Sequence, residues 1–144
     1  MSNQIYPCLW FDGQAQEAAK FYCSVFKNAR ITADNQMVVI FELNGRKFMG
    51  LNGGPNFKFN EAVSFVVDCE TQEEIDHYWS KLTADGGSES QCGWLKDRFG
   101  VSWQIVPTIL PKLLSDPSKT QRVLNAYMKM KKFDIAKLKE AYEQ

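Results

Sequence analysis

The sequence predicts an α+β fold in which two tandem β-α-β-β-β modules form a curved mixed sheet around a cavity, with C-terminal helices added. A strand, an aspartate and an amphipathic helix occur twice, at a constant offset of 56 residues. A hairpin pattern follows each copy, and the chain after Pro107 has no counterpart in the repeat. We therefore expect one domain over residues 1–144, with modules at 4–54 and 61–107 and a helical extension at 108–144.

The repeat becomes visible when residues 9–26 are aligned with residues 65–82. Identical residue types recur at Asp12 and Asp68, Gln16 and Gln72, Glu17 and Glu73, Tyr22 and Tyr78, and Ser24 and Ser80. Apolar residues after each aspartate follow helical spacing. Both aspartates are typical of helix starts, because a carboxylate there accepts hydrogen bonds from free backbone N–H groups. Their duplication favours this capping role over catalysis.

Two hairpins complete the modules. Asn44-Gly45 is a strong signal for a two-residue turn. The predicted strand pairs are 37–43 with 46–51, and 92–96 with 101–106, the second pair joined by a turn at 97–100. At the offset of 56, Phe48 corresponds to Gln104. No doubly wound parallel sheet is expected from this order of elements.

The extension at 108–144 predicts helices. Ser115-Asp116-Pro117 is a typical helix start, and Asp134 begins a final helix. This extension carries a net charge of +4, which balances −4 in the repeated modules. Its densest basic group is Lys129, Lys131 and Lys132, which is typical of a solvated helix face, so no nucleic-acid partner is expected.

Composition limits the remaining classes of protein. No apolar run approaches the roughly 20 residues of a membrane span, and no secretion signal precedes the first module. Cys8, Cys23, Cys69 and Cys92 occur singly, so we expect reduced thiols and a cytoplasmic location. One histidine, His77, cannot supply a cluster of metal ligands.

Alternation along the strands assigns side chains to two faces of a sheet. The bulky face is expected to pack on the helices, and Trp10 and Trp103 fall on it. The smaller face is expected to line a small-molecule cavity and contains Gly50, Asn52, Ala62, Ser64, Ser102 and Gln104. The alternative is an ordinary core in which Gln104 bonds a neighbouring backbone group.

Two further groups have alternative interpretations. Cys92 and Trp94 are two residues apart on a predicted strand and share a face, where Cys92 is either a nucleophile or, more simply, a small hydrophobic residue. Phe57 and Phe59 lie in the connector between the modules. They either cover the mouth of the cavity or join the modules and contact a partner subunit.

The sequence resembles the vicinal oxygen chelate superfamily, which has the glyoxalase and dioxygenase-like fold. Within it, the chain is similar to the demethylubiquinone methyltransferase-like (PhnB-like) family. The resemblance rests on LWFDGQA at 9–15, LNGGPNFKFN at 51–60, CGWLKDRFGVSWQIVP at 92–107 and the basic helical stretch at 114–132.

The resemblance implies a divalent metal held at positions that correspond to Ile5, Phe48, Ala62 and Gln104. Three of these residues cannot bind a metal, and one amide oxygen does not hold an ion, so we expect no metal. The family name implies methyl transfer, but neither Gly53-Gly54 nor Gly86-Gly87 lies in a glycine-rich loop between a strand and a helix. The methyltransferase activity is therefore not predicted.

The function predicted from the sequence is a metal-free, glyoxalase-fold protein that binds a small molecule and needs no cofactor. The expected ligand-binding residues are Asn52, Phe57, Phe59, Ser64, Trp94, Ser102 and Gln104. One alternative is an enzyme with a degenerate site, in which Gln104 polarises a substrate carbonyl or hydroxyl group. Another is an interaction protein with a filled cavity. The resemblance also implies a homodimer.

Overall fold

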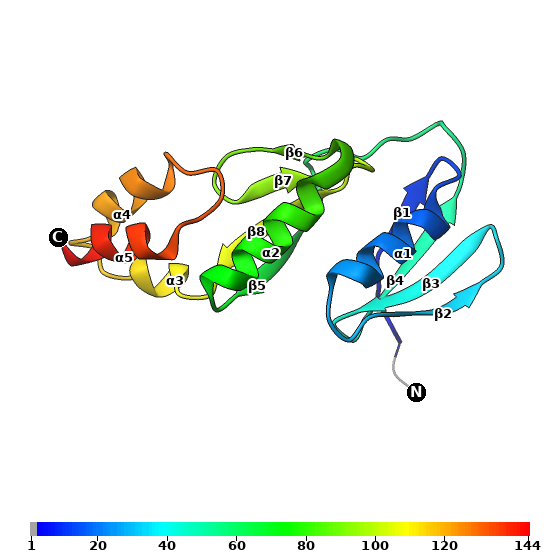
Figure 1. The fold of residues 1–144 in the computed structure, drawn as a ribbon, viewed down its shortest axis with the longest axis horizontal. Helices are drawn as coiled ribbons and strands as arrows, with labels where there is room; N and C mark the ends of the chain where they lie inside the picture. Colours follow the sequence, from blue (N-terminus) through cyan, green and yellow to red (C-terminus); the bar gives the residue numbers. More distant parts are fainter. Residues whose placement is uncertain (1–2) are drawn as a thin grey trace. The chain divides into compact units, whose positions relative to one another are not determined.

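Two four-stranded mixed sheets, each with a long helix on one face, make up most of the computed structural model, which describes residues 3–144 (Figure 1). The α+β class is therefore confirmed, as two β-α-β-β-β modules followed by short helices. The chain divides into two compact units, the first ending at Phe59 and the second running from Asn60 to Gln144. The expected single domain and the cavity enclosed by the sheets stay predictions.

The first unit holds one helix and four strands. They are β1 (Cys8–Phe11), α1 (Ala15–Val25), β2 (Arg30–Asp34), β3 (Val38–Leu43) and β4 (Arg46–Asn52). The strand order is β1-β4-β3-β2, with β1 parallel to β4 and the other pairs antiparallel. The alanines of α1 allow the helix to lie close to the sheet, where Ala15, Ala18 and Ala19 are fully buried.

The second unit repeats this arrangement. Its elements are β5 (Ser64–Cys69), α2 (Gln72–Thr83), the 3-10 turn η1 (Ala84–Gly86), β6 (Ser88–Glu89), β7 (Trp94–Lys96) and β8 (Ser102–Pro107). The strand order is β5-β8-β7-β6, and β5 is parallel to β8. Ile75, Trp79 and Leu82 of α2 are buried against this sheet, as the helical spacing predicts.

Three short helices form the C-terminal extension: α3 (Leu110–Leu113), α4 (Thr120–Tyr127) and α5 (Ile135–Glu143). The start of α5 is as predicted, because the Asp134 side chain accepts a hydrogen bond from Lys137 N at 3.1 Å. Helix α4 begins later than Ser115-Asp116-Pro117 predicts. Asp116 instead accepts hydrogen bonds from Ser118 N and Oγ in the turn before the helix.

The extension is fixed to the second unit by backbone hydrogen bonds beside β7. Cys92 N donates to Met130 O and Gly93 N to Lys131 O, both at 2.8 Å. Phe133 is buried directly over Gly93. Cys92 has a φ of 57° and precedes β7, so it does not share a sheet face with Trp94 as the spacing predicted.

The predicted caps of the two long helices are wrong. Helix α2 is capped by Thr71, whose hydroxyl accepts a hydrogen bond from Glu74 N at 3.2 Å, rather than by Asp68. At α1 the cap comes from a distant strand, where Asn52 Oδ1 accepts from Ala15 N at 2.8 Å. Asp12 therefore does not start α1.

Both predicted hairpins are confirmed. Asn44 and Gly45 have φ values of 50° and 77°, as a type I′ turn requires. In the second hairpin, buried Asp97 accepts hydrogen bonds from Phe99 N and Val101 N and from the indole of Trp103. A carboxylate with this many donors holds both the turn and the adjacent tryptophan, which is buried as predicted.

The predicted face of β4 is wrong. Phe48 stacks on Phe41 in the core, and a Cβ at Gly50 would lie 3.3 Å from that of Ala15 in α1. Asn52 therefore also faces α1. Trp10, predicted to face the helix, lies on the other side, paired with Leu51. By register with the first strand of each module, Leu51 rather than Phe48 corresponds to Gln104.

Replacing Gly93 with alanine is expected to destabilise the protein, because the new Cβ would lie 2.5 Å from Phe133 Cε2 and 2.9 Å from Ile105 O. With the added strain of a positive φ, the expected loss in the free energy of unfolding is about 2–4 kcal/mol. Gly13→Ala is the matched control, since Gly13 has a similar φ and nothing within 4 Å. Chemical denaturation would contradict this packing if both variants lost the same free energy.

Candidate functional site

Four of the seven predicted site residues lie together on the face of the second sheet that is turned away from α2. Residues paired across neighbouring strands point to the same face, so the register forms two rows. The rows are Ser64, Ser102 and Lys96, and Val66, Gln104 and Trp94. We call this set of six residues the polar face.

A hydrogen bond joins the two rows of the polar face. Gln104 Nε2 donates to Ser64 Oγ at 2.9 Å. The sequence left open a bond from Gln104 to a backbone group, and the structure places a side-chain hydroxyl there instead. Among the described residues, Gln104 Oε1 has no hydrogen-bond partner. It therefore remains available as an acceptor on this face.

Ser102 occupies the centre of its row. The residue is 1% exposed, and its Oγ has no hydrogen-bond partner among residues 3–144. A buried hydroxyl without a partner costs about 1–3 kcal/mol relative to a paired one. Most buried polar groups in proteins are paired, so the Ser102 hydroxyl is an exception among the described residues, as is Arg122 Nε.

Lys96 lies beside Ser102 and forms an ion pair with Glu61, with Nζ 2.7 Å from Oε1. Hydrogen bonding and the positive charge of Lys96 hold the pKa of Glu61 below its ordinary value. Sequence reasoning missed both residues. Alternation with Trp94 on one strand was the available signal for Lys96, whereas Glu61 precedes β5 without any local pattern that points to Lys96.

The other three predicted site residues belong to the first unit. Both N–H groups of the Asn52 amide are used, donating to Gln16 Oε1 at 2.8 Å and Gln36 O at 2.7 Å, so the side chain links α1 to the β2–β3 turn. Phe57 contacts Trp10 edge-on at 4.9 Å, and Phe59 contacts Phe11 at 5.4 Å. The connector therefore packs on aromatic rings of its own unit.

The positions at which the superfamily holds its metal do not assemble donors in this chain. Ile5 is 99% exposed and precedes β1, half-buried Phe48 stacks on Phe41, and Ala62 lies in a turn before β5. Residues 3–144 contain no group of three His, Cys, Asp or Glu side chains that could hold a metal ion. Gln104 alone does not fit a metal, and His77 lies exposed on α2.

The cysteines do not form an activated nucleophile. Burial raises the pKa of the Cys69 thiol to about 12, and burial also raises the pKa values of Cys8 and Cys23. The Cys92 thiol donates toward Tyr127 O at 3.8 Å, at the junction with the C-terminal extension. The interpretation of Cys92 as a small packing residue fits this placement.

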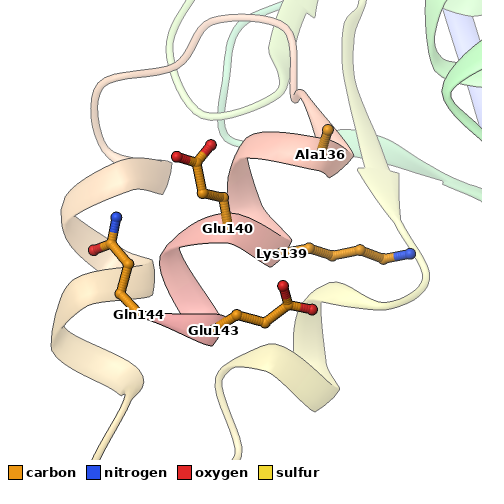
Figure 2. Close-up of a pocket in the computed structure, with 5 residues that line it drawn as sticks. All are labelled: Ala136, Lys139, Glu140, Glu143 and Gln144. Atoms are coloured by element: carbon orange, nitrogen blue, oxygen red, sulfur yellow. The ribbon is translucent and has the colours of Figure 1, made fainter.

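One surface hollow, of about 420 Å³, follows α5 and is lined by Ala136, Lys139, Glu140, Glu143 and Gln144 (Figure 2). The side chains of Lys139 and Glu140 point in different directions in Figure 2 rather than toward a common centre. A ligand site needs a few polar groups that converge. This hollow is therefore a weaker candidate than the polar face.

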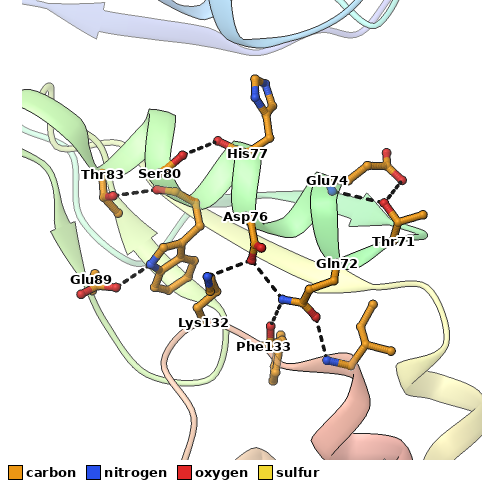
Figure 3. A network of polar contacts seen from close by, with 12 residues as sticks. Thr71, Gln72, Glu74, Asp76, His77, Ser80, Thr83, Glu89, Lys132 and Phe133 are labelled. Atoms are coloured by element: carbon orange, nitrogen blue, oxygen red, sulfur yellow. Dashed lines mark hydrogen bonds and ion pairs between the residues drawn. The ribbon is translucent and has the colours of Figure 1, made fainter.

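A second hollow, of about 390 Å³, lies where α2 and α5 begin. Its polar groups already bind one another (Figure 3): Gln72 donates to Asp76 and to Phe133 O, and accepts from Ile135 N. Lys132 completes the network with an ion pair to Asp76 at 2.8 Å. The network joins the extension to α2, so its function is structural.

The family model described as 3-demethylubiquinone-9 3-methyltransferase matches residues 3–106. The PhnB protein from Bacillus cereus is 34% identical, with a TM-score of 0.67 over 74% of this chain and 100% of that one. The extension after residue 106 lies outside the family model, and its resemblance to the family stays a prediction.

More distant solved structures show the fold alone. A glyoxalase/bleomycin resistance protein from Albidiferax ferrireducens is 15% identical, with a TM-score of 0.54 over 74% of this chain and 98% of its own. The fosfomycin resistance protein FosX from Listeria monocytogenes, complexed with Mn(II) and sulfate, is 15% identical, with a TM-score of 0.59 over 78% of this chain and 96% of its own. No protein with a curated function matches the chain.

No helix in the described part of the chain has the length and apolar character to cross a bilayer.

The capping role of Asn52 predicts that Asn52→Ala lowers the free energy of unfolding by about 1–2 kcal/mol, because the Ala15 N–H group loses its acceptor. Asn60→Ala is the matched control. Asn60 is exposed and its side chain accepts only from Ala62 N in a turn, so a change within about 0.5 kcal/mol is expected. Urea denaturation that found the two variants equally stable would contradict the capping role.

Proposed function

We propose a function from one established premise: the chain belongs to the 3-demethylubiquinone-9 3-methyltransferase (PhnB-like) family, which has the fold of the vicinal oxygen chelate superfamily. The proposed function is binding of a small molecule on the polar face of the second sheet, without a metal ion. Ser64, Trp94, Ser102 and Gln104 are the proposed ligand-binding residues.

The observation that carries this proposal is the buried Ser102 hydroxyl without a partner. A ligand group that forms a hydrogen bond with Ser102 would remove the free-energy cost of the unpaired hydroxyl. The recovered free energy would favour ligand binding. The neighbouring Gln104 Oε1 offers an acceptor within the same small area. Few, closely placed polar groups of this kind are typical of small-molecule sites.

The remaining members of the polar face support an apolar part of the ligand. Trp94 is half-buried and lies beside Gln104, and Val66 on the other side of Gln104 is 56% exposed. An indole ring and an exposed valine in one row offer a surface for a flat apolar body. The proposed ligand is therefore small, flat and polar at one end.

The structure gives no support to methyl transfer as the activity. Gly53 N and Gly54 N both donate to Phe11 O, and Gly87 N donates to Ala84 O. These backbone groups are used within the protein, so they do not form a glycine-rich loop that binds a cofactor. A family name does not by itself establish an activity, and the proposed function does not include S-adenosylmethionine chemistry.

The proposed setting is a homodimer in the cytoplasm. All four cysteines are free thiols, which supports a reducing compartment. Met128, after α4, is 65% exposed and offers apolar surface on the extension for a partner subunit. Sedimentation at micromolar concentration should give a dimer, and a monomer would contradict this part of the proposal.

Substitution of Ser102 separates ligand binding from structural roles. Because its hydroxyl is buried and unpaired, Ser102→Ala is expected to leave the free protein as stable as wild type or up to about 1–2 kcal/mol more stable. The same variant should lose the rise in Tm that a ligand produces in a thermal-shift screen of metabolites, quinones and S-adenosylmethionine included. Gln104→Leu should also lose it.

Ser80→Ala is the control for this screen, because Ser80 is exposed on α2, which covers the opposite face of the same sheet, and its hydroxyl donates to His77 O. It should keep the wild-type response to every compound. A ligand that stabilises Ser102→Ala and wild type equally would place the site elsewhere.

The absence of metal from the proposed mechanism is tested by elemental analysis of protein purified without chelator. Zinc, nickel, iron and manganese should each be far below one ion per chain. One equivalent of any of them would contradict metal-free binding, because Ile5, Phe48 and Ala62 have no donor atom and Gln104 alone does not hold an ion.

A further inference from the structure

We propose that the ligand of the polar face is a small aromatic carboxylate, which takes the place of Glu61 on Lys96 and accepts a hydrogen bond from Ser102. This inference rests on the proposed function and adds the chemical class of the ligand. Glu61 then acts as an internal carboxylate that competes with the ligand.

The row that contains Ser102 is rich in hydrogen-bond donors. Ser102 has an unpaired hydroxyl, and Ser64 Oγ accepts from Gln104, which leaves its own proton free to donate. Lys96 completes the row with an ammonium group. An ionised carboxylate has only acceptors, so it matches a row of donors better than a neutral amide, which brings N–H groups of its own.

Glu61 shows that a carboxylate fits at Lys96. Its Oε1 lies 2.7 Å from Lys96 Nζ, and the two side chains are 63% and 40% exposed. Exposed ion pairs contribute little to stability, so this carboxylate can be exchanged for another. Glu61 also lies in the turn before β5, outside the ladder of the sheet, so its departure breaks no strand pairing.

The charge of Lys96 and the position of Trp94 select among anions. The row provides one positive charge, from Lys96, which balances a monoanion. Trp94 lies in the second row, next to the donor row and two residues from Lys96 on the same strand. A ring attached to a carboxylate at Lys96 would therefore contact the indole. Gln104 Oε1 is the acceptor left for a hydroxyl substituent on that ring.

The test compares sodium benzoate with benzamide, which has the same shape and no charge, in titrations followed by NMR. Wild type should bind benzoate about tenfold more tightly than benzamide, because the charge-assisted hydrogen bonds are absent with the amide. Lys96→Met should abolish this preference. Glu61→Gln should bind benzoate several-fold more tightly than wild type, since the competing carboxylate is gone.

Glu73→Gln is the matched control, because it makes the same charge change on the exposed surface of α2, on the other side of the sheet. It should change the affinity for benzoate by less than about twofold. If Glu61→Gln and Glu73→Gln have equal effects, Glu61 does not compete for Lys96 and the inference is overturned.

Different results would overturn the ligand class, a carboxylate, and the site, the polar face. Benzamide binding as tightly as benzoate, with both lost in Ser102→Ala, would overturn the carboxylate and keep the polar face as a small-molecule site. Absence of benzoate binding at millimolar concentration would also overturn the carboxylate. Benzoate binding that Ser102→Ala and Lys96→Met leave unchanged would overturn both the ligand class and the site.

Discussion

Each sheet in this protein has one long helix of its own module, and that helix can cover only one of the two faces. In the first unit, α1 lies close to the sheet because its buried face is largely alanine, and Gly50 leaves room beneath it. In the second, α2 packs on β8, with the larger Trp79 and Leu82 buried on the helix and Trp103 and Ile105 buried on the strand. All strand side chains must therefore divide between a helix-covered face and a second face. The chemistry of the second face decides what each module can bind.

The second faces of the two modules have diverged. By register, Met49 corresponds to Ser102 and Leu51 to Gln104, so the positions that are polar in the second module are apolar in the first. Trp10 of the first module also lies on this face, with its indole donating to Gly54 O at 2.8 Å. The two modules share the same strand order and register, but the side chains on their second faces differ. Unused hydrogen-bonding capacity on this face belongs to the second module, at Ser102 Oγ and Gln104 Oε1.

Patterns within a few residues of the sequence correctly predicted the turns, helices and cap that depend on interactions between near neighbours. The Asn44-Gly45 turn, the Asp97 turn, the amphipathic helices and the Asp134 cap depend on residues within a few positions of one another. The face of β4 was predicted wrongly because the offset of 56 does not continue to the last strand. Its register is set by pairing with β1, far away in the sequence.

Asn52, Lys96 and Ser102 show the same limit of local reasoning. Asn52 caps a helix 37 positions away, and Lys96 pairs with a residue that no pattern connects to it. Ser102 was predicted at the site from strand alternation. Its lack of a hydrogen-bond partner, however, is a property of the folded structure alone.

The most direct test of the polar face as a ligand site is an NMR titration of isotope-labelled protein with sodium benzoate, recorded residue by residue. The side-chain amide of Gln104 and the backbone amides of Ser64, Lys96 and Ser102 should shift together with one saturation curve. Residues that line the hollow on α5 should not shift. Shifts confined to that hollow, or an unchanged Gln104 amide at saturating benzoate, would contradict the account.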